Sequence, residues 1–171
     1  MKKGLIKGIV VTIMFLTFGT LTNEVRAQYK TGAGLRFGGT SGVSLKHFYK
    51  PNAAYEGILG IFNNGFSITG LIERSAPAFD APGLYWYYGA GAHVALYDNH
   101  GRLHGFGRDI NDRDSDDIGL GIDGIVGLEY KIPDNVPLSI SMGLKPFLEI
   151  DSDGDWDLAP DPAITIRYIF K

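Results

Sequence analysis

The sequence contains no cysteine among its 171 residues and no amphipathic helical stretch of useful length. Between residues 28 and 171 it also lacks low-complexity segments and charged linkers, so nothing divides this part into two domains. Without cysteine the chain forms no disulfide, and it cannot carry the acylated cysteine of a bacterial lipoprotein. Its stability must therefore come from backbone closure and packing. The 16 Lys and Arg do not outnumber the 19 Asp and Glu, so nothing indicates nucleic-acid binding.

Residues 1–27 have the features of a secretory signal. Three lysines precede an uncharged apolar run over residues 8–21, and Val25-Arg26-Ala27 supplies small residues at the positions that a signal peptidase reads. The run is shorter than the roughly 20 apolar residues of a spanning helix, so cleavage is favoured over an anchor. Cleavage after Ala27 removes four bases and one acid, which leaves 12 against 18 and a net charge of −6. We therefore expect Sec-type export and a mature domain of residues 28–171.

One stretch of residues, 118–132, predicts the fold of the whole domain. Every even position in it is apolar or small, and the odd positions include Asp123, Glu129 and Lys131 beside three glycines. Alternation with period 2 indicates a β-strand with two different faces, and about ten residues suffice to cross a bilayer as a tilted strand. Similar patterns predict strands near 29–38, 42–50, 54–63, 65–74, 84–97, 118–132, 137–150 and 162–170. We expect an all-β fold, an eight-stranded antiparallel up-and-down transmembrane β-barrel.

The connections between these strands are unequal. Two of them, 98–117 and 151–161, are long and acidic, and each follows an odd-numbered strand. Both should therefore emerge at the same end, as in barrels with short periplasmic turns and longer external loops. Most of the others are short turns rich in Gly, Asn and Pro, and the segment 75–83, with two prolines, is a partial exception.

The composition of the two faces indicates which of them meets lipid. The polar face is rich in glycine, which weakens a solvated strand but fits a narrow lumen where small residues lie beside large ones. Aromatic side chains cluster where strands end on one side, as an interfacial girdle requires. The predicted girdle consists of Trp86, Tyr88, Tyr130, Tyr168 and Phe170. We therefore expect the apolar face to point outward, toward lipid.

The last predicted strand resembles the assembly signal of outer-membrane barrels. It carries Ile164, Ile166, Tyr168 and Phe170 on one face, although Lys171 follows the terminal aromatic and Thr165 stands where that signal often has glycine. In size and layout, residues 29–170 resemble the small eight-stranded outer-membrane barrels of Gram-negative bacteria, of the OmpX type or the type of the OmpA transmembrane domain. The resemblance implies a monomer in the outer membrane that contacts lipid and lipopolysaccharide, is inserted by the barrel-assembly machinery, and needs no cofactor.

If the apolar face meets lipid, the polar face fills the lumen. Six bases and five acids with one histidine share this face: Lys30, Arg36, Lys46, Glu56, Glu73, His93, Asp123, Glu129, Lys131, Lys145, Glu149 and Arg167. Eight strands leave room only for side chains, and buried charges must be paired, so we expect a nearly neutral ion-pair network and no open pore. Six large apolar residues share this face and predict bulges or shifted registers: Phe48, Ile58, Phe62, Leu71, Ile125 and Phe147.

Two alternatives to a non-enzymatic barrel remain open. His93 shares the lumen face with Ser139 and Ser141, and some eight-stranded barrels modify lipid A. The catalytic residues of those enzymes lie on the outer face near the external rim, where this sequence has no Ser and His pair at a short fixed spacing. A histidine in a barrel interior more often completes a polar network. The second alternative is a soluble, lipocalin-like periplasmic binder with an apolar interior.

The acidic segment after residue 150 is a weak candidate for a metal site. Asp151, Asp153, Asp155 and Asp157 alternate there around Gly154. This glycine is at the fourth position where an EF-hand requires it at the sixth, and no Glu closes the loop at the twelfth. Solvated external loops are the favoured interpretation, and we expect no bound metal. The leading hypothesis is a non-enzymatic outer-membrane barrel whose external loops serve envelope integrity or surface interaction.

Overall fold

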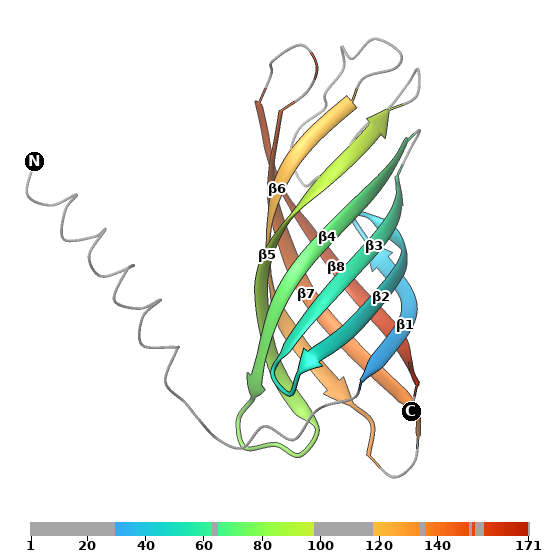
Figure 1. The fold of residues 1–171 in the computed structure, drawn as a ribbon, viewed down its shortest axis with the longest axis vertical. Coiled ribbons are helices and arrows are strands. Elements are labelled where there is room, and N and C mark those ends of the chain that lie inside the picture. The colour runs from blue at the N-terminus through green and yellow to red at the C-terminus, as the bar shows by residue number, and fades with distance from the viewer. Residues whose placement is uncertain are drawn as a thin grey trace, which may run out of the picture.

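The computed structural model describes residues 30–62, 65–97, 118–133, 136–150, 152 and 156–170. Eight strands follow one another in these ranges: β1 (Thr31–Gly38), β2 (Ser41–Lys50), β3 (Ala53–Phe62), β4 (Gly65–Pro77), β5 (Leu84–Tyr97), β6 (Ile118–Lys131), β7 (Leu138–Ile150) and β8 (Trp156–Phe170). Each pairs antiparallel with its sequence neighbours, and β1 also pairs with β8 (Figure 1). This confirms the predicted all-β, eight-stranded antiparallel barrel. Among the described residues, no helix is long and apolar enough to span a membrane.

Connections that follow odd-numbered strands lie together at one end of the barrel. β1 begins and β8 ends at the opposite end, the lower end in Figure 1, where β2–β3, β4–β5 and β6–β7 are joined. The ends of β5 and β6 that flank residues 98–117 therefore lie at the upper end, as predicted. The lower turn between β4 and β5 contains Phe79, Asp80 and Gly83 at positive φ, and the Gly83 carbonyl accepts a hydrogen bond from the Lys131 amide.

β8 begins at Trp156, well before the predicted start at residue 162. The predicted connection 151–161 is therefore too long, because six of its residues, 156–161, belong to a strand. Sequence analysis missed the first part of β8 because it contains Asp and Pro, which are depleted in strands. In the structure, Asp157 and Asp161 point inward and are buried, so the strand alternation runs through them.

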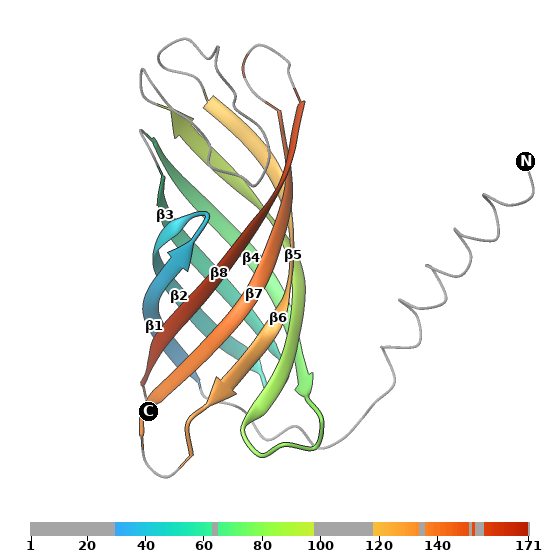
Figure 2. The ribbon, with the colours of Figure 1, turned by 180° about the vertical axis from the view of Figure 1, so that it is seen from behind.

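Within the described residues, the upper part of β8 pairs with one strand instead of two. β8 pairs with β7 from Trp156 to Tyr168, whereas its pairing with the shorter β1 ends at Ala163 opposite Gly38 (Figure 2). Just above this point, the Gly39 amide donates to the carbonyl of Pro162. The backbone amide and carbonyl of one residue in an antiparallel strand point to the same side. The ring nitrogens of Pro162 and of Pro160, two residues away, therefore face the side without a partner strand, and the β7 ladder is unaffected.

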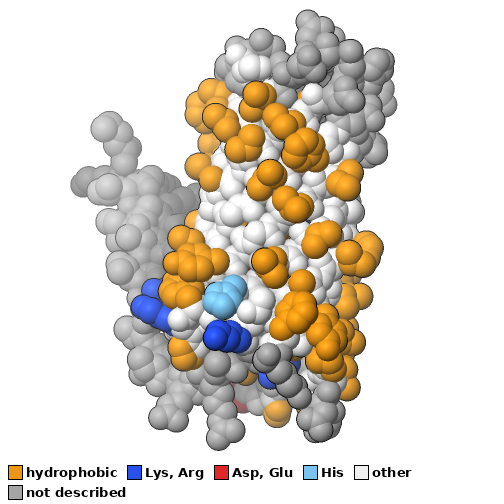
Figure 3. All heavy atoms as spheres, turned by 45° about the vertical axis from the view of Figure 1, so that its right-hand side comes forward, with side chains coloured by type: hydrophobic (Ala, Val, Ile, Leu, Met, Phe, Trp, Pro, Cys, Tyr) orange, Lys and Arg blue, Asp and Glu red, His pale blue; other side chains and the backbone are white. Residues whose placement is uncertain are grey.

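The outer surface of the barrel is apolar. Ile122 is 65 % exposed, Leu59 57 % and Ile72 56 %, and the same holds along the other strands. Figure 3 shows hydrophobic side chains over the full height of one face of the described barrel. The alternate positions of each strand point inward and are largely buried. The structure therefore has the two faces that the alternation predicts, with the apolar one outside.

Glycines on the inward face make room for large side chains opposite. A methyl group at Gly121 would overlap the His93 ring, and one at Gly127 or Gly143 would overlap the hydroxyl end of the Tyr87 side chain. By contrast, Gly57 and Gly70 point outward and have no atom close to where a methyl group would lie. The predicted alternation of small and large residues is thus present in the lumen.

The expected bulges at inward apolar residues are mostly absent. Ile58, Leu71 and Ile125 keep their registers and form a buried cluster with Tyr87. In the described residues, the pairing shifts between Phe48 and Lys50. The shift beside Phe48 agrees with the prediction, whereas at Ile58, Leu71 and Ile125 the prediction was wrong because apolar side chains pack between polar ones in the lumen without disturbing the strands.

Candidate functional site in the barrel lumen

Most of the predicted lumen residues lie inside the barrel. Ten of them are no more than 5 % exposed: Arg36, Lys46, Glu56, Glu73, His93, Asp123, Glu129, Lys145, Glu149 and Arg167. The other two lie at the lower end, where Lys30 is exposed and Lys131 half-buried. Asp157 and Asp161 also point inward. They were missed because they were assigned to a loop. Asp157, Asp161 and Thr165 are four residues apart, so they fall on the same face of a strand, and this spacing could have assigned the two acids to the lumen.

Arg167 on β8 is at the centre of the lower part of the lumen. Its Nη2 donates to Oε1 of Glu56 on β3, and its Nη1 donates to Oγ of Ser141 on β7 at 2.8 Å. Its Nε donates to Oγ of Ser44 on β2 at 3.0 Å, and Ser44 in turn donates to Oε1 of Glu56 at 2.7 Å. One guanidinium thus joins four strands, and its planar fork of donors is well suited to this task.

Lys46 on β2 is the second cation of the lower part. Its Nζ lies 2.7 Å from Oε2 of Glu73 and 3.1 Å from Oε2 of Glu129, and it faces the Tyr87 ring at 4.5 Å from the centroid. Ser139 donates to Oε1 of Glu129 at 2.9 Å. Together, the Arg167 and Lys46 contacts form what we call the lower network, which ties β2 to β8 through every strand between them.

The lower network holds more carboxylates than cations. Lys46 and Arg167 face Glu56, Glu73 and Glu129. Apart from the Lys46 ion pair, both oxygens of Glu73 lack a hydrogen-bond donor, as does Oε2 of Glu56. The side chains of Glu56 and Glu73 are themselves neighbours. A proton on Glu73 would give it a donor for Glu56, so the hydrogen-bond accounting favours one shared proton in this pair.

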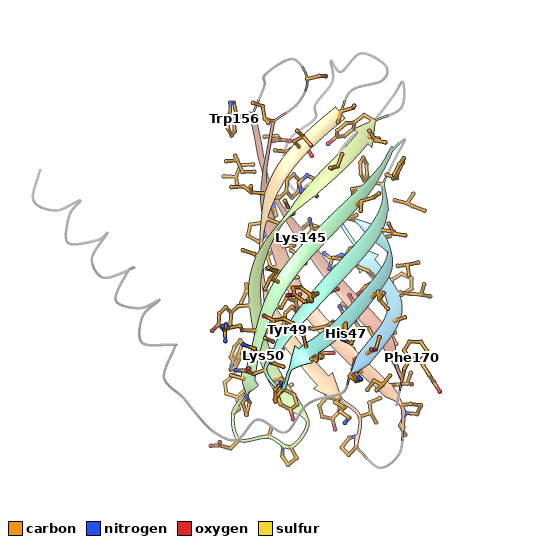
Figure 4. The ribbon with its side chains drawn as sticks, in the orientation of Figure 1. His47, Tyr49, Lys50, Lys145, Trp156 and Phe170 are labelled. Carbon is orange, nitrogen blue, oxygen red and sulfur yellow. The ribbon has the colours of Figure 1, made fainter. Side chains whose placement is uncertain are left out.

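A second network fills the upper part of the lumen. Nη2 of Arg36 on β1 donates to Oδ2 of Asp161 on β8 at 3.1 Å. Lys145 Nζ on β7 lies 3.5 Å from the same oxygen and donates to Oδ1 of Asp123 on β6 at 2.8 Å. Cations and carboxylates therefore alternate along this part of what we call the upper network; Figure 4 shows the position of Lys145 in the barrel.

The upper network continues through His93 on β5. Its Nδ1 lies 2.9 Å from Oδ2 of Asp123, and its Nε2 lies 2.8 Å from Oε2 of Glu149 on β7. Both carboxylates can accept from the ring only when both ring nitrogens carry protons. Tyr97 donates to the other Glu149 oxygen at 2.6 Å, and the Phe147 ring packs edge-on against His93. His93 thus completes a polar network.

An apolar layer separates the two networks. Along the inward face of β6, Asp123 belongs to the upper network, Ile125 to the apolar cluster, and Glu129 to the lower network. Phe48, Ala54 and Ile169 form a further buried cluster on β2, β3 and β8. The described part of the lumen is therefore packed with side chains in layers.

The expectation of near-neutrality is wrong for the described interior. Four cations point inward: Arg36, Lys46, Lys145 and Arg167. Seven carboxylates do so: Glu56, Glu73, Asp123, Glu129, Glu149, Asp157 and Asp161. Even a charged His93 leaves the carboxylates in excess. The prediction failed because it counted Lys30 and Lys131 inside and left out Asp157 and Asp161.

The structure does not bring together the residues of the enzymatic alternative. Ser139 and Ser141 bond to Glu129 and Arg167 in the lower network, and both ring nitrogens of His93 face carboxylates in the upper network. Of the metal candidates, Asp157 lies inside β8 opposite Glu149, while Asp151, Asp153 and Asp155 lie outside the described residues. The described ranges contain no group of three or more potential metal ligands arranged around one ion.

The predicted aromatic girdle lies on the outer surface of the lower end. Trp86, Tyr130, Tyr168 and Phe170 are exposed and Tyr88 is half-buried. Tyr49 and Tyr55 also belong to this belt, with ring centroids 4.4 Å apart. They were missed in the sequence, although they flank the turn at residues 51–52 where two strand ends meet.

Comparison with known proteins leaves the function open. No protein-family model matches the chain, and neither does any curated protein. Among solved structures, the chain is similar to the crystal structure of CarO2 from Acinetobacter baumannii, with a TM-score of 0.41 and 11% identity, over 83% of this chain and 99% of that chain. The comparisons do not identify the chain with the OmpX or OmpA type. Function therefore has to be inferred from the barrel itself.

Proposed function

We propose that the chain is a non-enzymatic outer-membrane β-barrel protein of a Gram-negative bacterium, exported through the Sec pathway. Its packed barrel would hold external loops that serve envelope integrity or surface interaction. The observation that carries this proposal is the inversion of the two faces, with apolar side chains outside and an ionic interior. In water this arrangement would expose a large apolar surface and bury many charges, whereas in a bilayer the outer face is solvated by lipid.

Strand length supports the same conclusion. β4 to β8 contain 13 to 15 residues each, and a tilted strand needs about 9 to 11 to cross the hydrocarbon core. Closure between β1 and β8 satisfies the backbone hydrogen-bonding groups of the two terminal strands, for which lipid tails offer no partners. We further propose that the protein is a monomer inserted by the barrel-assembly machinery, with Phe170 exposed at the lower end of the closing seam.

The packed lumen supports a closed barrel over an open channel. Both networks and the apolar layer cross the interior, and the ionic side chains at their centres are almost fully buried. Planar-bilayer recording of the refolded mature protein should show no stable currents at the nanosiemens scale. A stable open state of that size would contradict the proposal of a filled lumen.

Two observations favour a binding or structural role over the alternatives. The lipid A-modifying alternative is based on His93 with Ser139 and Ser141, but both nitrogens of His93 face carboxylates in the upper network and the two serines bond in the lower network. A soluble lipocalin-like binder needs an apolar interior, and the described interior holds eleven Lys, Arg, Asp and Glu side chains. Incubation of the refolded protein with purified lipid A should therefore leave its acyl chains intact.

Membrane fractionation tests the central proposal. We expect the mature protein to stay in the membrane pellet after osmotic shock and to need detergent for release. On SDS gels it should run at different positions before and after boiling, because a closed barrel resists the detergent until heated. A soluble periplasmic protein in the same cells serves as the control. Release by osmotic shock alone would contradict the membrane assignment.

A further inference from the structure

The exposed basic side chains of the described barrel all lie at its lower end. Lys30, Lys50 and Arg74 are exposed there, whereas the Lys and Arg side chains higher in the described barrel point into the lumen. Figure 3 shows Lys, Arg and His side chains near the lower end of one face, below a hydrophobic surface. Among the described acids, only Asp80, in the turn between β4 and β5, is exposed. The outer surface therefore changes from apolar to basic toward this end.

These three basic side chains and that of His47 lie on β2 and β4, or directly before β1 in the case of Lys30. Lys30 directly precedes β1, and its carbonyl accepts from the Phe48 amide of β2 at 2.8 Å. His47 on β2 pairs in register with Thr31 on β1 and with Tyr55 on β3. We call the surface formed by Lys30, His47, Lys50 and Arg74, with Tyr49 and Tyr55, the basic foot.

Lys50 and Arg74 lie on either side of the small residue Ala53 of β3. Lys50 pairs in register with Ala53, which pairs on its other side with Arg74. Ala53 is fully buried beneath its neighbours, and its methyl group is too short to keep the two long basic side chains apart. Strands two places apart lie about 10 Å from each other, a gap that two long basic side chains can close around one small anion.

The aromatic and imidazole groups of the basic foot are held in place. The rings of Tyr49 and Tyr55 stack at an interplanar angle of 21°, and Lys50 Nζ lies 6.0 Å from the Tyr49 centroid. Nδ1 of His47 is hydrogen-bonded to Oγ1 of Thr31 at 2.9 Å, which leaves Nε2 for an external partner. His47, Tyr49 and Lys50 lie close together in Figure 4, at the lower end of the strands.

No carboxylate in the described ranges pairs with Lys30, Lys50 or Arg74. The acids on the neighbouring strands, Glu56 and Glu73, point to the other side of the wall and are bound in the lower network. The positive charge of the basic foot is therefore not neutralised by the described part of the protein. Directly above it, Leu45 on β2 and Ile72 on β4 are exposed and apolar.

We propose that the basic foot binds the headgroup of a glycerophospholipid. Lys50 and Arg74 contact the phosphate from two sides, Nε2 of His47 donates to it, and Lys30 adds charge. The stacked tyrosines lie beside the glycerol region, and the acyl chains run up the apolar surface that begins at Leu45 and Ile72. The order of apolar, aromatic and basic side chains along the wall matches the order of acyl chain, interface and phosphate in a lipid leaflet. This inference rests on the proposed function, because it requires the barrel to be in a bilayer.

Lipid titration by native mass spectrometry tests the proposal. The refolded mature protein in detergent is titrated with phosphatidylglycerol and, separately, with phosphatidylcholine, and a dissociation constant is measured for the first bound lipid. Wild type should prefer phosphatidylglycerol. The double variant Lys50→Gln/Arg74→Gln should bind it about 30-fold more weakly, since each basic residue near an anionic lipid surface contributes about 1 kcal/mol. Added salt should reduce the preference of wild type.

The single variants Lys50→Gln and Lys131→Gln form a matched pair, because each removes one charge at the lower end and only the first lies in the basic foot. Lys50→Gln should weaken phosphatidylglycerol binding about fivefold or more, and Lys131→Gln should not. Equal affinities in wild type, both single variants and the double variant would overturn the inference. The heat-dependent gel shift checks that each variant is folded.

Insertion into pure phosphatidylcholine vesicles separates this inference from the proposed function. If wild type and the double variant both insert and bind phosphatidylglycerol equally, the headgroup site is wrong and the membrane assignment stands. If wild type does not insert at all, the membrane assignment itself fails, whatever the titration shows.

Discussion

The lower and upper networks place buried charges in different arrangements. In the lower network, one guanidinium and one ammonium are each shared by several strands, and their side chains are at most 2 % exposed. In the upper network, charges form a line from Arg36 to Tyr97, and its acid Asp161 has two cationic neighbours. Loss of Arg167 should therefore be more damaging than loss of Arg36, because Arg167 is the ion-pair partner of Glu56, whereas Asp161 pairs with both Arg36 and Lys145.

The largest effect is expected from Arg167→Met. It removes four hydrogen bonds or ion pairs and leaves the buried Glu56 without its ion-pair partner. Breaking a buried pair from one side costs about 3 to 5 kcal/mol of unfolding free energy. Urea titration of the protein in phosphatidylcholine vesicles, followed by the heat-dependent gel shift, measures the loss. The exposed Arg74→Met is the matched control, and an equal loss in both would contradict the role given to Arg167.

Arg36→Met should be milder, at about 2 kcal/mol in the same titration. Asp161 loses its bond from Arg36 but keeps Lys145 Nζ at 3.5 Å and still accepts from the Thr40 amide at 2.9 Å. A loss as large as that of Arg167→Met would show that the upper network tolerates the removal of one cation no better than the lower network does. The comparison between them would then not hold.

Packing around His93 is tested by Gly121→Ala. The added methyl group overlaps the imidazole ring, so we expect a loss of about 1 kcal/mol or more from forced displacement. Gly70→Ala places the same group on the outer surface, where no atom lies within 4 Å, and should be neutral or slightly stabilising. If both substitutions have the same effect, inward glycines do not serve to make room.

The smallest change is expected from Glu73→Gln. It removes one charge from a network with three carboxylates and two cations, and its amide can donate to the unpaired oxygen of Glu56. The two gains offset the weaker contact with Lys46, so stability should change by less than about 1 kcal/mol. Glu56→Gln should cost more, because Glu56 is the main partner of Arg167. If Glu73→Gln costs more stability than Glu56→Gln, the shared proton is on Glu56 instead of Glu73.

Sequence alternation could predict the strands and their faces, but not which side chains pair with each other inside the barrel. The pattern over residues 118–132 assigns Asp123 and Glu129 to one face from local spacing alone. Which cation each acid meets depends on the register around the closed wall: Lys46 meets Glu129 from 83 positions away, and Arg167 meets Glu56 from 111. Asp161 was missed for a related reason, since an Asp between two prolines reads as a loop unless the lumen that needs its charge is known.

The upper part of β8 shows how the barrel wall ends. Its side facing away from β7 has no described strand partner above Ala163, and such an edge is a template on which another chain can add a strand. Pro160 and Pro162 have no amide hydrogens, so two of the donors that such an addition would need are missing from this side. Replacing both prolines by residues with an amide hydrogen would leave the pairing of β7 and β8 intact and would allow the edge of β8 to pair with a further strand. The two prolines thus make the described edge of β8 a poorer template for a further strand than the same edge with two amides would be.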